Sequence, residues 1–329
     1  CATTSRSWPV WKSDASVTGP HRATRRDIPA LNRLFSDAFT DRYRRDGMAS
    51  VRVPHLNPLV WQYALGNAGD GAMLWRDGRG DLLAFNLAHR SGREGWMGPI
   101  AVRADRQGQG IGCRIVDAGI DWLRTAGATT IGLETMPRTV ENIGFYARLG
   151  FRPGPLTVTL QGLAEADDGG PAIRIGELPV GARTPRLAEC LALTAAVTPG
   201  ADYTRECDLT LQLELGDVHC VLDEDGKVAG FAVWHGVPLA EGRRAEELRI
   251  LKLIARDAPI ARRVVRAVAA EAHRRRLEHV TLRCQGTQGE LFGGLVNAGW
   301  QVQWTDLRMT LDGFPEPAPQ GVALSNWEI

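Results

Sequence analysis

Three glycines stand at alternate positions, Gly108, Gly110 and Gly112, in the stretch RADRQGQGIGCRIV. The apolar residues before them predict a strand and the pattern after them predicts an amphipathic helix, so the glycines lie in a strand-to-helix loop. Glycine lets the backbone approach a phosphate closely, and the free N–H groups of a helix N-terminus attract an anion. The loop therefore predicts a phosphate site, although a tight turn without any ligand would also use glycine.

Two well-known phosphate-binding motifs do not fit this loop. A dinucleotide fingerprint beginning at Gly108 would need glycine at position 113, where Cys113 stands, and a P-loop would need Gly-Lys-Ser/Thr before the helix. What remains is Gln107-x-x-Gly110-x-Gly112.

A second motif follows in LETMPRTVENIGFYARLGF, where a strand carries Glu134 and the next helix carries Asn142 and Tyr146 on one face. Taken in this order, the two motifs resemble the GNAT superfamily of acyl-CoA N-acyltransferases. The resemblance implies that the loop holds the pyrophosphate of coenzyme A and that Tyr146 lies near its thiol. Some members of the family use a Glu twelve residues before this Tyr as general base, and Glu134 occupies that position.

The resemblance also implies the remaining contacts to the cofactor, and it implies acetyl-CoA as co-substrate with no metal. These contacts would come from the strand end, the loop and the second helix: Ile100, Ala101, Val102, Gln107, Gly108, Gln109, Gly110, Ile111, Gly112, Asn142 and Phe145.

The chemistry of such a site is acyl transfer to an amine. An alkylamine has a pKa of about 10 and must lose a proton before it attacks a thioester. Glu134 would accept that proton directly or through a water, which Glu134 or a nearby histidine, His55 or His89, would hold. Backbone N–H groups at a splayed strand end, residues 100–102, would stabilise the oxyanion, and Tyr146 would protonate the departing thiolate.

Two departures from the family pattern leave other functions open. Many relatives carry Asn where Thr139 stands, and many carry a carboxylate near Gly98 and Pro99. We therefore keep two alternatives: a sensor that binds acyl-CoA without turnover, and a scaffold that binds no cofactor.

The order of predicted elements is strand and helix, hairpin, strand, helix, strand, helix and strand, which predicts an α/β fold with a mixed sheet. The same order of predicted elements then occurs a second time, and IAVR in the first copy matches LIAR in the second, as ARLGF matches VNAGW. We expect two tandem GNAT-like domains. The predicted segments are a flexible leader (1–18), a catalytic domain (19–164), a linker (165–171), a degenerate domain (172–312) and a tail (313–329).

The second repeat lacks the residues that carry the proposed chemistry. Its loop, RDAPIARRVV, has no glycine, and the alignment places Arg283 opposite Glu134 and Leu295 opposite Tyr146. We expect this domain to be non-catalytic and either to build the interface or to form a wall of the acceptor site, which the domain and the tail could enclose together.

The composition excludes few functions, but it argues against nucleic acid and membranes as partners. The formal net charge is +1 over 329 residues, which gives no global electrostatic case for nucleic acid. No run reaches the ~18 apolar residues that span a bilayer. The six cysteines are scattered, as in a reduced cytoplasmic protein. We expect a small-molecule amine as acceptor, no nucleic-acid or membrane partner, and a monomer or homodimer.

Overall fold

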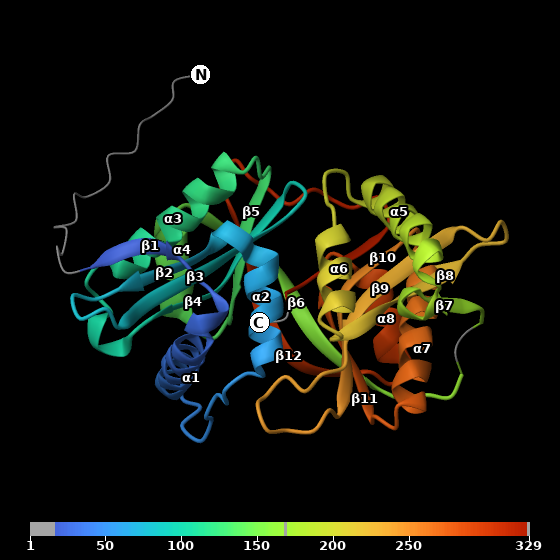
Figure 1. Ribbon diagram of the computed structural model, residues 1–329, viewed down its shortest axis with the longest axis horizontal. Helices are drawn as coiled ribbons and strands as arrows, with labels where there is room; N and C mark the ends of the chain where they lie inside the picture. The colour runs from blue at the N-terminus through green and yellow to red at the C-terminus, as the bar shows by residue number, and fades with distance from the viewer. Residues whose placement is uncertain (1–16, 168–169, 328–329) are drawn as a thin grey trace.

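A single mixed sheet runs through the whole molecule in the computed structural model, which describes residues 17–167 and 170–327 (Figure 1). Its strands follow the order β1-β2-β3-β4-β5-β12-β6-β11-β10-β9-β8-β7, and β13 pairs with β10 outside this path. The predicted α/β architecture with a mixed sheet is confirmed. The order also confirms the internal repeat, because the two sides of the sheet mirror each other about β12 and β6.

The elements of the first half have the predicted sequence of types. They are β1 (Thr18–Arg22), α1 (Ile28–Arg45), α2 (Pro58–Ala68), β2 (Ala72–Arg76), β3 (Leu82–Ser91), β4 (Glu94–Val102), α3 (Ile111–Thr125), β5 (Thr130–Thr135), α4 (Val140–Arg148) and β6 (Phe151–Leu163).

The second half repeats them, with α6 as the counterpart of α2, and adds β13; the sequence analysis missed both α6 and β13. Its elements are β7 (Ala172–Arg174), α5 (Val180–Val197), α6 (Thr204–Gln212), β8 (Gly216–Leu222), β9 (Val228–His235), β10 (Glu247–Ala255), α7 (Ala258–Arg274), β11 (His279–Gln285), α8 (Gly289–Asn297), β12 (Gln301–Leu311) and β13 (Val322–Ser325).

Helices cover both faces of the sheet in each half. Successive residues of a strand point to opposite faces. In β2, Leu74 packs with α1 and α2, whereas Trp75 packs with α3 and α4. In β9, Phe231 packs with α5 and α6, whereas Trp234 packs with α7. The shared pattern shows that both halves are built as the same three-layer unit.

The two halves exchange their last long strands. β12, from the second half, pairs antiparallel with β5, and β6, from the first half, pairs antiparallel with β11. β6 and β12 also pair with each other, and Figure 1 shows both crossing the middle of the molecule. Each half therefore depends on a strand of the other. The domain limits at 19–164 and 172–312 stay predictions, because the halves share one sheet.

The predicted leader and linker fall partly outside the described residues. Residues 1–16 of the leader and residues 168–169 of the linker are not described. The leader was predicted too long, since Val17 is buried in the core and β1 begins at Thr18.

Candidate active site

The glycine loop connects β4 to α3 and needs glycine at two positions. Gly108 and Gly110 have φ values of 74° and 81°, in the left-handed region that side chains rarely adopt. A Cβ added at Gly108 would meet no atom within 4 Å, so its open side faces free space. Gly110 is also the N-cap of α3, a helix of 15 residues, and the free N–H groups of its first turn lie beside that space.

The strand before the loop separates from its neighbour. β4 pairs in parallel with β5 only from Glu94 to Met97. Beyond Met97 it keeps its partner β3 on one side, up to Val102. The opposite edge of residues 98–102 therefore faces a gap, which is the splayed strand end expected from the resemblance.

A cavity of about 820 Å³ lies between the loop, the splayed strand and α4. Most of the predicted cofactor residues line it: Ile100, Ala101, Val102, Gln107, Gly108, Gly110, Gly112, Asn142 and Phe145. Gln109 and Ile111 do not. The Gln109 amide oxygen accepts from Arg106, and the Ile111 side chain is buried in the core, so these two could contact a ligand only through their backbones.

Arginines of α1 also line this cavity. They are Arg42 and Arg45, and Arg45 donates to the side chain of the loop residue Gln107 at 3.2 Å. Their cluster, DRYRRDG at residues 41–47, is visible in the sequence; such a charge cluster is usually a solvated face, and a contact to the acceptor or to the phosphates of coenzyme A is its functional interpretation.

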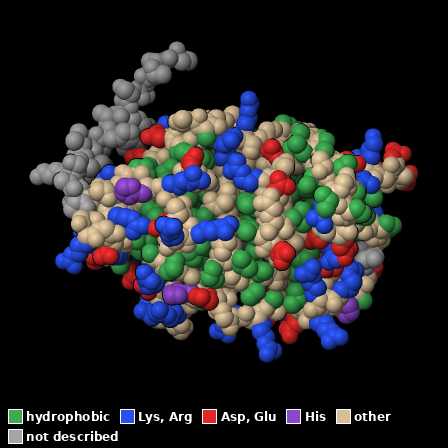
Figure 2. All heavy atoms as spheres, in the orientation of Figure 1, with side chains coloured by type: hydrophobic (Ala, Val, Ile, Leu, Met, Phe, Trp, Pro, Cys, Tyr) green, Lys and Arg blue, Asp and Glu red, His purple; other side chains and the backbone are tan. Residues whose placement is uncertain are grey.

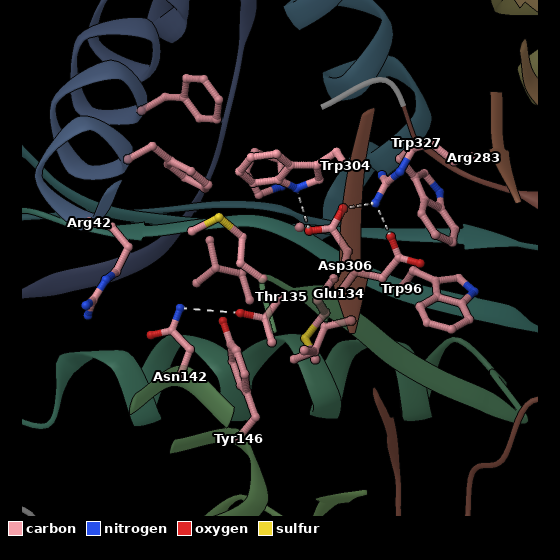
Figure 3. Close-up of a pocket in the computed structure, with 18 of the residues that line it drawn as sticks. Arg42, Trp96, Glu134, Thr135, Asn142, Tyr146, Arg283, Trp304, Asp306 and Trp327 are labelled. Atoms are coloured by element: carbon pink, nitrogen blue, oxygen red, sulfur yellow. Dashed lines mark hydrogen bonds and ion pairs between the residues drawn. The ribbon is translucent and has the colours of Figure 1, made fainter. Parts of the chain in front are cut away.

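A second cavity of about 290 Å³ adjoins the first. The two share Phe39, Arg42, Ile100, Asn142 and Tyr146, so they meet at Tyr146. The second half contributes Arg283, Trp304 and Asp306 to its wall, and the tail contributes Trp327 (Figure 3). The expectation that the second half and the tail help to wall this region fits their position.

Tyr146 is buried at the junction of the cavities and is 9% exposed. Burial raises the pKa of its phenol to about 12, so the hydroxyl stays protonated at neutral pH. One turn earlier, Asn142 donates to the Thr135 hydroxyl at 3.5 Å. Thr139 is the N-cap residue of α4, but its hydroxyl donates to Asp46, the C-cap residue of α1, instead of capping α4.

Glu134 lies in the wall of the second cavity, yet its oxygens are already bonded. Oε1 accepts from Thr157 and from Arg308 Nη1 at 2.7 Å, and Oε2 accepts from Arg283. Burial acts to raise the pKa of this carboxyl, but the two guanidiniums hold it below its usual range. Such a carboxylate is a weak base, and this bonding does not favour the role given to Glu134 by the resemblance.

Neither histidine lies in the wall of a site cavity. His89 is buried behind it and bonds the Gly98 carbonyl at 2.9 Å, and burial lowers its pKa to about 4. His55 is exposed and lies 3.9 Å from Glu241. The structure therefore does not bring either imidazole to the junction.

Residues 28–151 match the sequence profile described as the acetyltransferase (GNAT) family. The matched segment contains the loop, the splayed strand and Tyr146. Residues 28–151 of the first half are thus a GNAT-type segment.

Solved structures extend the likeness to the whole chain. A protein from Pyrococcus horikoshii, described as a candidate acetyltransferase, has a TM-score of 0.67 at 14% identity, covering 95% of this chain and 96% of its own. A GCN5-related N-acetyltransferase from Sphaerobacter thermophilus has a TM-score of 0.58 at 16% identity, covering 93% and 98%. A tandem GNAT protein from the clavulanic acid biosynthesis pathway has a TM-score of 0.54 at 12% identity, covering 88% and 98%.

At these identities the likeness shows a shared fold. It confirms that the chain is built as two tandem GNAT-like units. A search of curated proteins found no match.

In the second GNAT-like half, the chain itself fills the place of the donor groove. β10 pairs with β11 only from Glu247 to Ile250, as β4 does with β5. Here, however, β13 pairs antiparallel with β10 from Lys252 to Ala255. The following helix, α7, is capped by Asp257, whose carboxylate accepts from the Ile260 N–H. Backbone groups and helix N-terminus are thus already occupied, and a carboxylate stands where a phosphate would lie.

The described residues contain neither a cluster suited to a metal ion nor a helix suited to crossing a membrane. No cluster of three His, Cys, Asp or Glu residues suited to a metal ion occurs within residues 17–167 and 170–327. Over the same residues, no helix combines the length and apolarity needed to cross a membrane.

Proposed function

We propose that the protein is an acetyl-CoA-dependent N-acetyltransferase that acetylates a small primary amine by direct attack in a ternary complex. The observation that carries this proposal is the meeting of two cavities at Tyr146. One cavity suits the acyl donor and the other suits the acceptor.

The residues of the larger cavity fit coenzyme A. The first-turn N–H groups of α3 and the guanidiniums of Arg42, Arg45 and Arg148 would surround its phosphates. The free edge of β4 after Met97 would accept the amide groups of the pantetheine arm as a strand accepts its neighbour. The positive φ of Gly108 and Gly110 keeps side chains out of this path.

The junction of the cavities would carry the chemistry. A thioester carbonyl placed beside residues 100–102 would receive hydrogen bonds from backbone N–H groups of the free β4 edge as negative charge develops on its oxygen. The Tyr146 hydroxyl, held protonated by its burial, would donate to the departing thiolate. Both groups are fixed by the sheet and by α4, so little reorganisation is needed.

The smaller cavity favours a small acceptor over a protein terminus, because strands and the tail of the second half close it. Figure 2 shows basic and acidic side chains interspersed over the visible face of both halves, which does not favour nucleic acid as a partner. We further propose a cytoplasmic monomer or homodimer that uses no membrane partner.

Calorimetric titration with coenzyme A tests the donor site. The proposal expects one molecule bound per chain, with the affinity lost when the loop is altered. Two molecules per chain would show that the second half also binds, and absence of binding would favour the scaffold alternative. Binding without acetylation of any amine would favour the sensor.

A further inference from the structure

The smaller cavity lies beside an ionic cluster with excess negative charge, and Glu134, Asp306 and Arg283 of this cluster line the cavity. Four carboxylates, Glu94, Glu134, Asp306 and Glu316, face two guanidiniums, Arg283 and Arg308. Lys252 and Glu206 lie nearby and add one charge of each sign. The remaining cation in the cavity wall, Arg42, is itself bonded to Asp46 and Glu141. The cluster would therefore attract a cation such as a substrate ammonium.

Among these carboxylates, Asp306 is the one whose bonding leaves room for a ligand at the cavity. It receives Arg283 Nη2 on Oδ2 at 2.6 Å and the Trp304 indole N–H on Oδ1 at 3.3 Å. A carboxylate has about four acceptor positions, so acceptor capacity remains. Glu134, by contrast, accepts from Thr157, Arg283 and Arg308.

Aromatic side chains surround the same space. The cavity wall contains seven of them: Phe35, Phe39, Tyr43, Trp96, Tyr146, Trp304 and Trp327. Ring faces attract cations, and rings also pack well against an apolar body. This lining favours an amine carried on an apolar or ring-bearing group.

We infer that Asp306, on the strand that the second half inserts beside β5, binds the ammonium of the acceptor and accepts its proton. The inference rests on the proposed function and names the acceptor class, a primary amine on an apolar body. It gives the degenerate half a direct part in the reaction, because β12 carries Asp306 into the cavity of the first half (Figure 3).

The proton transfers balance as follows. Asp306 takes one proton from the ammonium, which leaves a neutral amine. The amine nitrogen bonds to the thioester carbon, the oxyanion collapses, and the carbon–sulfur bond breaks. The thiolate leaves as a thiol with a proton from Tyr146, which regains one from the nitrogen through water. Asp306 then releases its proton to solvent, so the products are the amide, free thiol and one proton.

The groups around Asp306 suit this role. Arg283 of β11 faces it and opposes protonation, whereas burial and Glu134 of β5 favour it, and the net effect raises the pKa of Asp306. Tyr43 of α1 also faces the carboxylate, and the pKa of its phenol is raised by burial first and by the Asp306 charge second. Glu134 is shifted in the opposite direction. Two neighbouring carboxylates thus divide into a structural anion and a proton acceptor.

Calorimetry with 2-phenylethylamine and its neutral analogue 2-phenylethanol tests the inference without acetyl-CoA. We expect wild type to bind the amine about tenfold more tightly than the alcohol, and Asp306→Asn to lose this preference. The matched control, Asp312→Asn, alters an exposed carboxylate just beyond the same strand and should keep it. Equal binding of the two compounds to wild type, failure of both to bind, or a preference retained in Asp306→Asn would overturn the inference.

The pH profile gives a second readout. With this amine as substrate, Asp306→Asn should lower kcat/KM by about 100-fold and remove the acidic limb of the profile. Its affinity for coenzyme A should match wild type, which separates failure of this inference from failure of the donor site. An unchanged profile in Asp306→Asn would refute the assignment.

Discussion

Glu134 and Arg308 lie directly opposite each other on the adjacent strands β5 and β12, and Arg308 Nη1 donates to Glu134 Oε1 at 2.7 Å. The ion pair joins the two halves of the molecule at the exchanged strand. Arg308 is 1% exposed, and its Nε and Nη2 also donate to the carboxylate of Glu316 in the tail. Glu134, which occupies the position of the general base in some family members, thus also holds the two halves together through this ion pair.

Glu134→Gln should lower the free energy of unfolding by about 3 to 5 kcal/mol at pH 7, because it leaves buried guanidiniums without their anion. The folded-state pKa of Glu134 is lowered, so its stabilisation is complete above the unfolded pKa of about 4.5 and is lost as pH falls through the folded pKa. Denaturant titrations at several pH values should show the gap between wild type and variant closing below about pH 4.

A matched control for that loss is Glu290→Gln. Glu290 is 74% exposed and lies 3.9 Å from Arg262, so its removal should cost no more than about 1 kcal/mol. Equal stability of Glu134→Gln and wild type at pH 7 would show that the ion pair between Glu134 and Arg308 does not hold the halves together.

Gly110→Ala should weaken coenzyme A binding about tenfold. A residue with a Cβ adopts the left-handed conformation of position 110 at a cost of ~1–2 kcal/mol, and the alanine places a methyl group in the donor cavity. Gly127→Ala supplies the control at the other end of α3. Gly127 has a φ of 83° and open space around its missing Cβ, but it lies away from the cavity. We expect the two variants to lose similar stability, but only Gly110→Ala to lose affinity for coenzyme A. Equal affinities of the two variants for coenzyme A, measured by calorimetry, would argue against the loop as the phosphate site.

Tyr146→Phe should lower kcat by about 10- to 100-fold and leave coenzyme A affinity within about twofold. The hydroxyl is removed while the ring that packs against Phe151 remains. Because the pKa of Tyr146 is about 12, its ionisation should not shape the rate profile below about pH 10. Steady-state kinetics with unchanged kcat in the variant would exclude Tyr146 as the proton donor.

Leu324→Ala should cost about 2 to 5 kcal/mol of stability, since Leu324 of β13 is fully buried in the core of the second half. The same change at Leu163, which is 67% exposed at the end of β6, should have little effect. Thermal unfolding that does not distinguish the two variants would show that the tail strand contributes nothing to the second half.

Local patterns in the sequence were sufficient to predict most elements and the donor loop. Helical and alternating apolar patterns mark the individual helices and strands, and the glycines at 108 and 110 report their own backbone conformation. These features depend on neighbours in the chain, which a single sequence displays.

The exchange of β6 and β12 could not be predicted in this way, because either strand could pair with β5 by its own pattern. That pairing decides which carboxylate is free. It brings Arg283 and Arg308 to Glu134 and places Asp306 in the acceptor cavity. The resemblance gave the role of proton acceptor to Glu134, whereas the position of Asp306 favours that residue. Arg283 had been aligned as the counterpart of Glu134 in the repeat, and the fold makes the two direct partners.

Free thiol released from acetyl-CoA in the presence of a panel of primary amines, compared with the same reaction without amine, tests the central claim most directly. The account predicts thiol release that depends on an amine and equals the amount of N-acetylated product. Thiol release that no amine raises above the amine-free control would contradict it.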